Sequence, residues 1–157
     1  MLQFRLLYIR VGILQAARQM GGESRYPRRM SEAAPSPAQA VLTRWSDVPR
    51  EPLNPQLTRQ FITGEQAMLA RIDLKKGAIV PRHSHANEQI SWITEGALRF
   101  TLGEPGQEQE VVVRAGEVLV IPGNLPHAAE AMEDTVDFDL FAPPRQDWIS
   151  KDDAYLR

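Results

Sequence analysis

Cysteine is absent from the 157-residue chain, and its absence narrows the chemistry that the protein can carry out. Without cysteine there are no disulfides, no thiolate nucleophiles and no cysteine-ligated zinc, so a bound metal ion must be held by nitrogen and oxygen atoms. Long apolar runs are also missing, because arginines interrupt the apolar residues near the N-terminus and leave neither a signal-peptide core nor a membrane span. We therefore expect a cytoplasmic protein with no membrane partner.

Positive charge is scarce beyond the first thirty residues, and the whole chain has a net charge of -2. No face rich in lysine or arginine is predicted there, which argues against a nucleic-acid partner. With 43% apolar and 24% charged residues, the chain can bury one good core. We expect a single folded domain that binds a small ligand or another protein.

The first 29 residues differ from the rest in charge, since they hold six arginines and one acid. An arginine-rich, acid-poor leader can imitate a transit peptide. We favour the simpler interpretation that translation begins at Met30, just before a polar linker that contains proline. Residues 1–40 are then expected to be a disordered or misassigned extension, and residues 41–157 the folded domain. The six arginines are Arg5, Arg10, Arg18, Arg25, Arg28 and Arg29, and the acid is Glu23.

From about Thr58 onward, short β-rich runs are separated by glycine, proline and asparagine, a spacing typical of an all-β sandwich or barrel. Eight antiparallel strands of this size predict a single double-stranded β-helix, or jelly-roll barrel, whose side chains alternate between interior and exterior. Residues 41–60 are expected to form an arm that packs on the barrel or on a second subunit. The strands are predicted over Ala67–Leu74, Ile79–His85, Glu88–Thr94, Ala97–Leu102, Glu110–Arg114, Val118–Ile121, Ala128–Met132 and Thr135–Phe141.

Histidine occurs only three times, and all three residues suit one metal site. His83 and His85 are two residues apart on a predicted strand, so both imidazoles project from the same face and can share one ion. His127, which comes from a distant strand, can complete the site. The alternative is that the histidines only fill a barrel interior. All three histidines of the chain fit the spacing of one metal site, which argues against this alternative.

These residues resemble the two motifs of the cupins. The first motif is a glycine, five residues, His-x-His, three or four residues, an acid, six residues and a glycine, and the second is Gly-Asp-x4-Pro-x4-His. The resemblance implies a cupin jelly-roll barrel and four metal ligands. Gln89 stands where many cupins have glutamate, with Glu88 one position earlier as its rival, and only one of the two can face the metal. The matching residues are Gly77, His83, His85, Gln89 and Gly96, then Gly116, Pro122 and His127, with Glu117 in place of the aspartate.

Three imidazoles and one amide are all neutral, so the charge of a divalent ion would stay uncompensated by its ligands. Such a site favours an anionic, oxygen-rich ligand and Lewis-acid chemistry. The ion is expected to be Ni, Zn, Mn or Fe, and the sequence does not choose among them.

The last predicted strand carries Asp137, Asp139 and Phe141 on one face and three apolar residues, Val136, Phe138 and Leu140, on the other. We expect the apolar face to be core and the acidic face to line solvent or the barrel mouth. Arg145 follows after the Pro143-Pro144 pair.

The run from Asp139 to Trp148 is similar to the ending of the pectin-degradation cupins, which convert 4,5-unsaturated uronates into linear keto-uronates. The resemblance implies an anionic sugar-acid substrate and three catalytic residues. Asp139 would be the general acid/base, Arg145 would clamp the carboxylate bidentately, and Phe141 would pack on the sugar face.

Two other functions remain open at this stage. A metal-dependent cupin dioxygenase would need a redox metal, and Gln89 in place of a carboxylate argues against it. A non-enzymatic cupin that binds metal or sugar would not need Asp139 or Arg145. Trp92 and the run Val111-Val112-Val113 suggest more apolar sheet surface than one small barrel can bury, so we also expect a homodimer.

Overall fold

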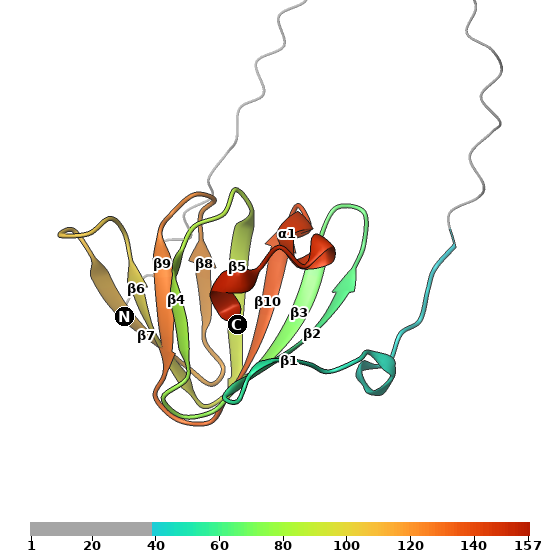
Figure 1. Cartoon of the computed structure of the whole chain (residues 1–157), viewed down its shortest axis with the longest axis horizontal. Coiled ribbons are helices and arrows are strands. Elements are labelled where there is room, and N and C mark those ends of the chain that lie inside the picture. The colour runs from blue at the N-terminus through green and yellow to red at the C-terminus, as the bar shows by residue number, and fades with distance from the viewer. Residues whose placement is uncertain (1–38) are drawn as a thin grey trace, which may run out of the picture. The chain divides into compact units, whose positions relative to one another are not determined.

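Among residues 39–157, which the computed structural model describes, ten strands form two sheets that pack as a jelly-roll barrel (Figure 1). The predicted all-β fold is confirmed. The extension predicted over residues 1–40 lies outside the described residues except at its last two positions, and it stays a prediction. The strands are β1 (Glu51–Asn54), β2 (Leu57–Thr63), β3 (Met68–Leu74), β4 (Ile79–His83), β5 (Glu88–Glu95), β6 (Ala97–Leu102), β7 (Gln109–Arg114), β8 (Val118–Ile121), β9 (His127–Ala131) and β10 (Thr135–Ala142).

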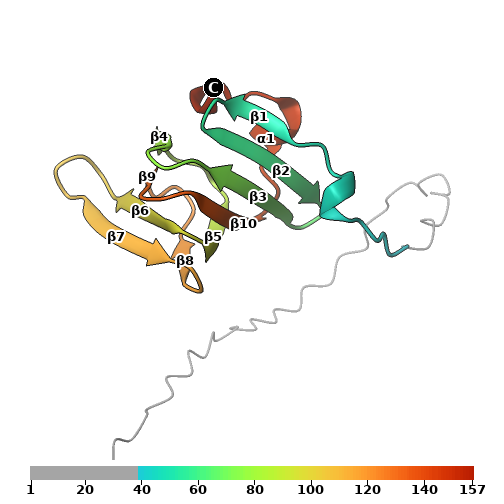
Figure 2. The same cartoon turned by 90° about the horizontal axis from the view of Figure 1, so that it is seen from below.

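The two sheets have the orders β1-β2-β3-β10-β5-β8 and β4-β9-β6-β7, and their strands pair antiparallel (Figure 2). Three short helical segments accompany them: η1 (Trp45–Asp47), α1 (Gln146–Ser150) and η2 (Ala154–Leu156). In Figure 1 the C-terminal segment that contains α1 lies in front of the sheets, and η2 contacts β4. No helix within residues 39–157 is long and apolar enough to cross a membrane.

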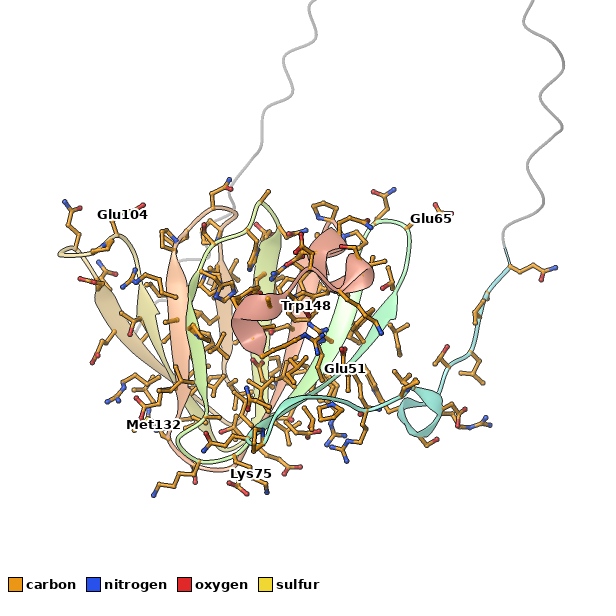
Figure 3. The ribbon with its side chains drawn as sticks, in the orientation of Figure 1. Glu51, Glu65, Lys75, Glu104, Met132 and Trp148 are labelled. Carbon is orange, nitrogen blue, oxygen red and sulfur yellow. The ribbon has the colours of Figure 1, made fainter. Side chains whose placement is uncertain are left out.

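Alternating side chains produce the core. In β3, for example, Met68, Ala70, Ile72 and Leu74 are buried while the residues between them are not. A strand places successive side chains on opposite faces, so this pattern puts the apolar face of β3 between the sheets. In Figure 3 charged side chains such as Glu65 lie at the periphery, whereas Trp148 lies over the middle of the barrel.

Two strands, β1 and β2, were not predicted. The segment expected to be an arm does pack on the barrel, because Leu53 is buried and the Trp45 ring meets Phe138 edge-on at 5.6 Å. However, it also extends the six-stranded sheet as its edge. Proline is tolerated on an edge strand because that backbone position needs no hydrogen-bond donor. Pro52 in β1 therefore marks an edge strand rather than the absence of a strand.

The prediction that the apolar face of β10 is core was wrong. Asp137, Asp139 and Phe141 are buried, whereas Leu140 is exposed. β10 lies between β3 and β5, and its acidic face points into the barrel. Phe138 faces outward, where it packs against Trp92 at 6.1 Å.

The outer face of the six-stranded sheet is apolar along β5, β8 and β10. Trp92, Val118, Val120 and Leu140 all have exposed side chains there. This is the kind of surface from which the homodimer was predicted. The homodimer itself stays a prediction.

Candidate metal centre

The three histidines come together at one end of the barrel interior. His83 ends β4 and pairs directly across the sheet with His127, the first residue of β9, while His85 lies in the loop that follows β4. The ring centroids of His83 and His127 are 4.3 Å apart, and those of His85 and His127 are 5.1 Å apart. One nitrogen from each ring lies within 4.8 Å of the others, so the three residues can hold one metal ion.

Hydrogen bonds to the backbone set the tautomer of each imidazole. Nδ1 of His83 lies 2.9 Å from the carbonyl oxygen of Pro81, and Nδ1 of His127 lies 2.8 Å from that of Leu125. His85 has the same arrangement with Asn87, at 3.0 Å. A carbonyl oxygen only accepts, so each Nδ1 must carry the proton, and each Nε2 keeps a free lone pair. Nε2 of His127 is buried without a hydrogen-bond partner.

Gln89 presents its amide oxygen to the same point. Its Oε1 lies 3.1 Å from Nε2 of His85, and its Nε2 donates to Ser91 Oγ and to Asp139 Oδ1, both at 2.9 Å. Because His85 carries its proton on Nδ1, two lone pairs face each other across the 3.1 Å gap. A cation that both atoms ligate relieves this repulsion, so the donor set fits a divalent metal ion.

Burial keeps the imidazoles neutral. It lowers the pKa of His83 to about 4, with the nearby His127 as the next cause, and it lowers the pKa of His85 to about 4, with the positive charge of Arg145 next. The pKa of His127 is also lowered by burial. Neutral imidazole is the form that binds metal, so the site stays competent well below the ordinary histidine pKa.

Metal affinity should therefore be nearly independent of pH above about 5. The lowered pKa values keep His83 and His85 unprotonated until the pH falls to about 4, and the pKa of His127 is also lowered. We therefore expect less than a tenfold loss of affinity between about pH 7.5 and about pH 5.5, part of it from protonation of Asp139. Three histidines with a pKa near 6.5 would instead lose up to about 1000-fold. Calorimetric metal titrations at both pH values decide between these results.

Gln89 is the better placed of the two rival ligands. Its side chain is buried at 5% exposure, whereas Glu88 is exposed. We predict that Gln89→Ala weakens metal binding at least about tenfold, as losses around metal sites commonly do. Glu88→Ala, its matched control, should change the affinity less than about twofold. A calorimetric titration in which Glu88→Ala is the weaker binder would make Glu88 the ligand.

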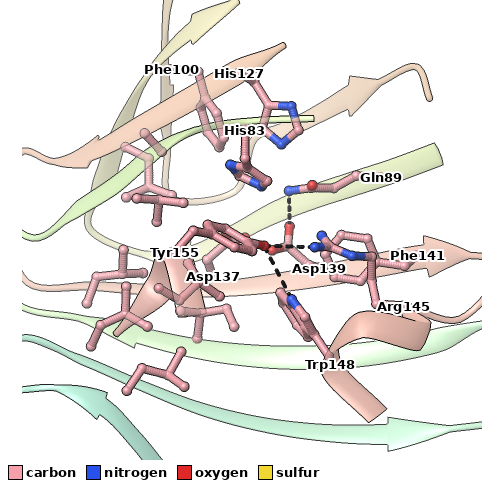
Figure 4. Close-up of a pocket in the computed structure, with 18 residues that line it drawn as sticks. His83, Gln89, Phe100, His127, Asp137, Asp139, Phe141, Arg145, Trp148 and Tyr155 are labelled. Carbon is pink, nitrogen blue, oxygen red and sulfur yellow. Dashed lines mark hydrogen bonds between the residues drawn. The ribbon is translucent and has the colours of Figure 1, made fainter. Parts of the chain in front are cut away.

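Asp139 lies behind Gln89 and faces the same cavity (Figure 4). Its Oδ1 accepts hydrogen bonds from Gln89 and Ser91. Burial raises the pKa of Asp139 to about 6, and these two hydrogen bonds limit the rise. Asp137, two residues earlier, has a pKa raised well above its ordinary value by burial and by the charge of Asp139. A carboxyl group whose pKa is close to neutral pH can both give and take a proton.

Arg145 and Phe141, the other two residues implied by the resemblance, line the same cavity as Asp139. The Arg145 guanidinium lies 5.2 Å from the centroid of the Phe141 ring. Phe141 in turn meets the His85 ring edge-on at 5.6 Å. The structure thus gathers all seven predicted site residues in one region, while their roles remain predictions.

Two loop contacts hold this region together. A Cβ atom on Gly123 would lie 2.4 Å from the carbonyl oxygen of Ala86, so only glycine lets the β8–β9 loop approach the loop that carries His85. The backbone nitrogen of Asn124 donates to the His85 carbonyl at 2.7 Å. On the other side, Asn87 donates to the Pro143 carbonyl at 2.6 Å, which ties the His85 loop to the corner before Arg145.

Sequence reasoning missed three residues of the site. Ser91 follows Gln89 by two positions on β5, so strand alternation could have identified it. Asp147 pairs with Arg145, and Tyr155 stacks on His83 with ring centroids 4.8 Å apart. Both come from the C-terminal segment, and no spacing in the sequence indicates that this segment folds back over the barrel.

Comparison with known proteins identifies the fold. Residues 70–142 match the family described as the cupin domain. The described part of the chain has the cupin jelly-roll fold. Arg145 and the C-terminal segment lie outside the matched range. No curated protein sequence matches this chain.

Solved structures agree on the fold. An RmlC-like cupin from Shewanella frigidimarina NCIMB 400 is 23% identical with a TM-score of 0.63, and the match covers 70% of this chain and 96% of that chain. KdgF from Halomonas sp. is 24% identical with a TM-score of 0.60, and the match covers 69% of this chain and 99% of that chain. A variant of oxalate decarboxylase OxdC from Bacillus subtilis is 22% identical with a TM-score of 0.57, and the match covers 67% of this chain but 30% of that chain.

Proposed function

We propose that this cupin is a metal-dependent enzyme that converts 4,5-unsaturated uronates into linear keto-uronates. One observation carries the proposal: the carboxyl of Asp139 and the guanidinium of Arg145 line the same cavity as His83, Gln89 and His127. These are the acid/base group, the cation and the candidate metal ligands that such a reaction needs. They come from β4, β5, β9, β10 and the segment after β10, and they converge although most are far apart in the sequence.

The reaction is an isomerisation in which atoms balance within the substrate. In a 4,5-unsaturated uronate the C4–C5 bond belongs to an enol ether conjugated to the carboxylate. Ring opening breaks the bond between C1 and the ring oxygen as the C1 hydroxyl loses its proton. The enolate that results becomes a ketone at C5 when a proton is added to C4. A proton must therefore leave one oxygen and reach one carbon.

Asp139 is placed to move that proton. Its Oδ1 is held by Gln89 and Ser91, whereas its Oδ2 has no hydrogen-bond partner among residues 39–157. With a pKa of about 6, the carboxyl can accept the hydroxyl proton and return it to carbon near neutral pH. Phe141, buried at 1% exposure, keeps an apolar wall beside it that excludes water.

Arg145 supplies positive charge for the substrate carboxylate. Its side chain is almost fully buried, at 2% exposure, and its Nη1 has no hydrogen-bond partner. A buried donor without a partner costs free energy until an acceptor arrives, so this nitrogen favours an anionic ligand. A metal ion held by the three histidines and Gln89 would supply Lewis-acid stabilisation of negative oxygen.

The direct test is an ultraviolet assay of the metal-loaded protein. Loss of the absorbance of the unsaturated uronate faster than its spontaneous decay supports the proposal. If the loaded protein leaves the uronate untouched, the proposal is wrong. Oxygen uptake with candidate substrates then tests the dioxygenase alternative, and binding without turnover tests the non-enzymatic one.

A further inference from the structure

The C-terminal segment brings a phenol into the site. Tyr155 lies on η2, where its ring stacks on His83 at an angle of 30° (Figure 4). Its hydroxyl oxygen accepts a hydrogen bond from Arg145 Nη2 at 2.7 Å and a longer one from Trp148 Nε1 at 3.4 Å. Tyr155 thus bridges a candidate metal ligand and the cation of the site.

The hydrogen bonds of Arg145 leave only one of its nitrogens free. Nε and Nη2 donate to the two carboxylate oxygens of Asp147, at 2.9 and 2.6 Å, and the second hydrogen of Nη2 points to Tyr155. The bidentate edge that was expected to clamp a substrate carboxylate is therefore occupied by Asp147. Nη1 alone remains, buried and without a partner.

Tyr155 has an unused donor next to that nitrogen. Its oxygen already accepts from Arg145 and Trp148, and its own hydroxyl hydrogen has no acceptor within residues 39–157. Two adjacent donors, the Tyr155 hydroxyl and Arg145 Nη1, thus lack acceptors at a cavity that both residues line. Two neighbouring donors of this kind suit the two oxygens of one carboxylate.

We propose that Tyr155 is a ligand-binding residue whose hydroxyl donates to one carboxylate oxygen of the bound acid, while Arg145 Nη1 donates to the other. The inference rests on the proposed function only for the choice of a uronate as the acid.

Buried contacts hold the segment that carries Tyr155 in place. Its neighbour Asp153 forms an ion pair of 2.6 Å with Arg59, and both side chains are fully buried. The Arg59 guanidinium also lies 4.3 Å from the Trp148 ring, and Asn54 donates to the Leu156 carbonyl at 3.1 Å. The C-terminal segment, residues 146–157, is thereby anchored to β1 and β2.

The same segment lines the cavity, whose volume is about 50 Å³. That volume holds a few water molecules but not a sugar acid. The acid can therefore enter only if side chains that line the cavity shift.

The test is the binding of saturated galacturonate, which lacks the reacting double bond, to the zinc-loaded protein. Calorimetry should show about 10- to 100-fold weaker binding for Tyr155→Phe, because a hydrogen bond to a charged group is lost while the ring on His83 is kept. Ser150→Ala, which removes an exposed hydroxyl from the same segment, is the matched control and should bind as the wild type does.

A second ligand separates hydrogen bonding from packing. The neutral methyl ester of galacturonate should bind wild type and Tyr155→Phe with similar affinity, so the preference for acid over ester falls in the variant. Equal binding of the acid by wild type and Tyr155→Phe overturns the inference, and so does a wild type that binds no galacturonate. Because the probe cannot react, a failed turnover assay refutes the proposed reaction without altering this result.

Discussion

Asp139→Asn is expected to lower the turnover of a 4,5-unsaturated uronate by at least about 100-fold, the usual contribution of a positioned acid/base group. Asparagine keeps the size of the side chain and can still accept hydrogen bonds from Gln89 and Ser91, but it cannot exchange a proton. The loss should appear in kcat, since Asp139 acts on the reacting atoms. Ultraviolet kinetics and metal content are measured on the same preparation.

Asp137→Asn is the matched comparison for this variant. It removes a second buried carboxyl from the same face of β10, two residues away, which has no bond to Gln89. We expect this variant to lose less than about tenfold in turnover, because Asp137 lacks the hydrogen bonds that orient Asp139. If Asp139→Asn retains its metal and turns over uronate at the wild-type rate, Asp139 has no chemical role.

His127→Ala is expected to abolish the stabilisation that a metal ion gives to the fold. Free metal at about 1000 times its Kd stabilises a protein by about 4 kcal/mol, which raises the Tm of a domain of this size by on the order of 10 °C. The variant loses a buried candidate ligand whose Nε2 has no hydrogen-bond partner among the described residues, so its Tm should hardly respond to metal. Thermal unfolding is measured with added zinc and again after a chelator has removed the zinc, which gives the Tm of the metal-bound and of the metal-free protein.

Glu130→Ala is the control on the same strand. Glu130 pairs with Arg99 on the outer surface of β9, so its loss should leave the response to metal intact. Each protein is compared with its own metal-free form, which removes the cost of the cavity that His127→Ala leaves in the core. A variant that gains as much stability from zinc as the wild type would show that His127 is not a ligand.

Local spacing explains what the sequence could predict. The strands from Met68 onward alternate apolar and polar residues between glycine turns, and such patterns depend on near neighbours only. The sequence could predict His83, His85, Gln89 and His127 as candidate ligands because motif spacing is also a local property. The structure brings them together, with Gln89 inside and Glu88 outside.

Tertiary context explains what the sequence could not predict. In β10 the apolar residues looked like core, yet Leu140 and Phe138 face outward, because the inner face of this strand carries the polar side chains of the site, next to the apolar core of the barrel. The sequence could not predict the place of Tyr155 in the site for a different reason. Tyr155 reaches His83 because contacts distant in sequence, among them the buried Arg59–Asp153 pair, hold the C-terminal segment against the barrel.

The backbone hydrogen bonds of the histidines have a consequence for how this site can change. Each Nδ1 is bound by a carbonyl only two residues away in the chain, as in His83 with Pro81. The tautomers are thus specified within β4 and the two loops that carry His85 and Leu125, and they need no polar side chain from elsewhere. The polar residues around the cavity do not orient these imidazoles, so we expect substitutions such as Tyr155→Phe to change acid binding while the candidate metal ligands keep their tautomers.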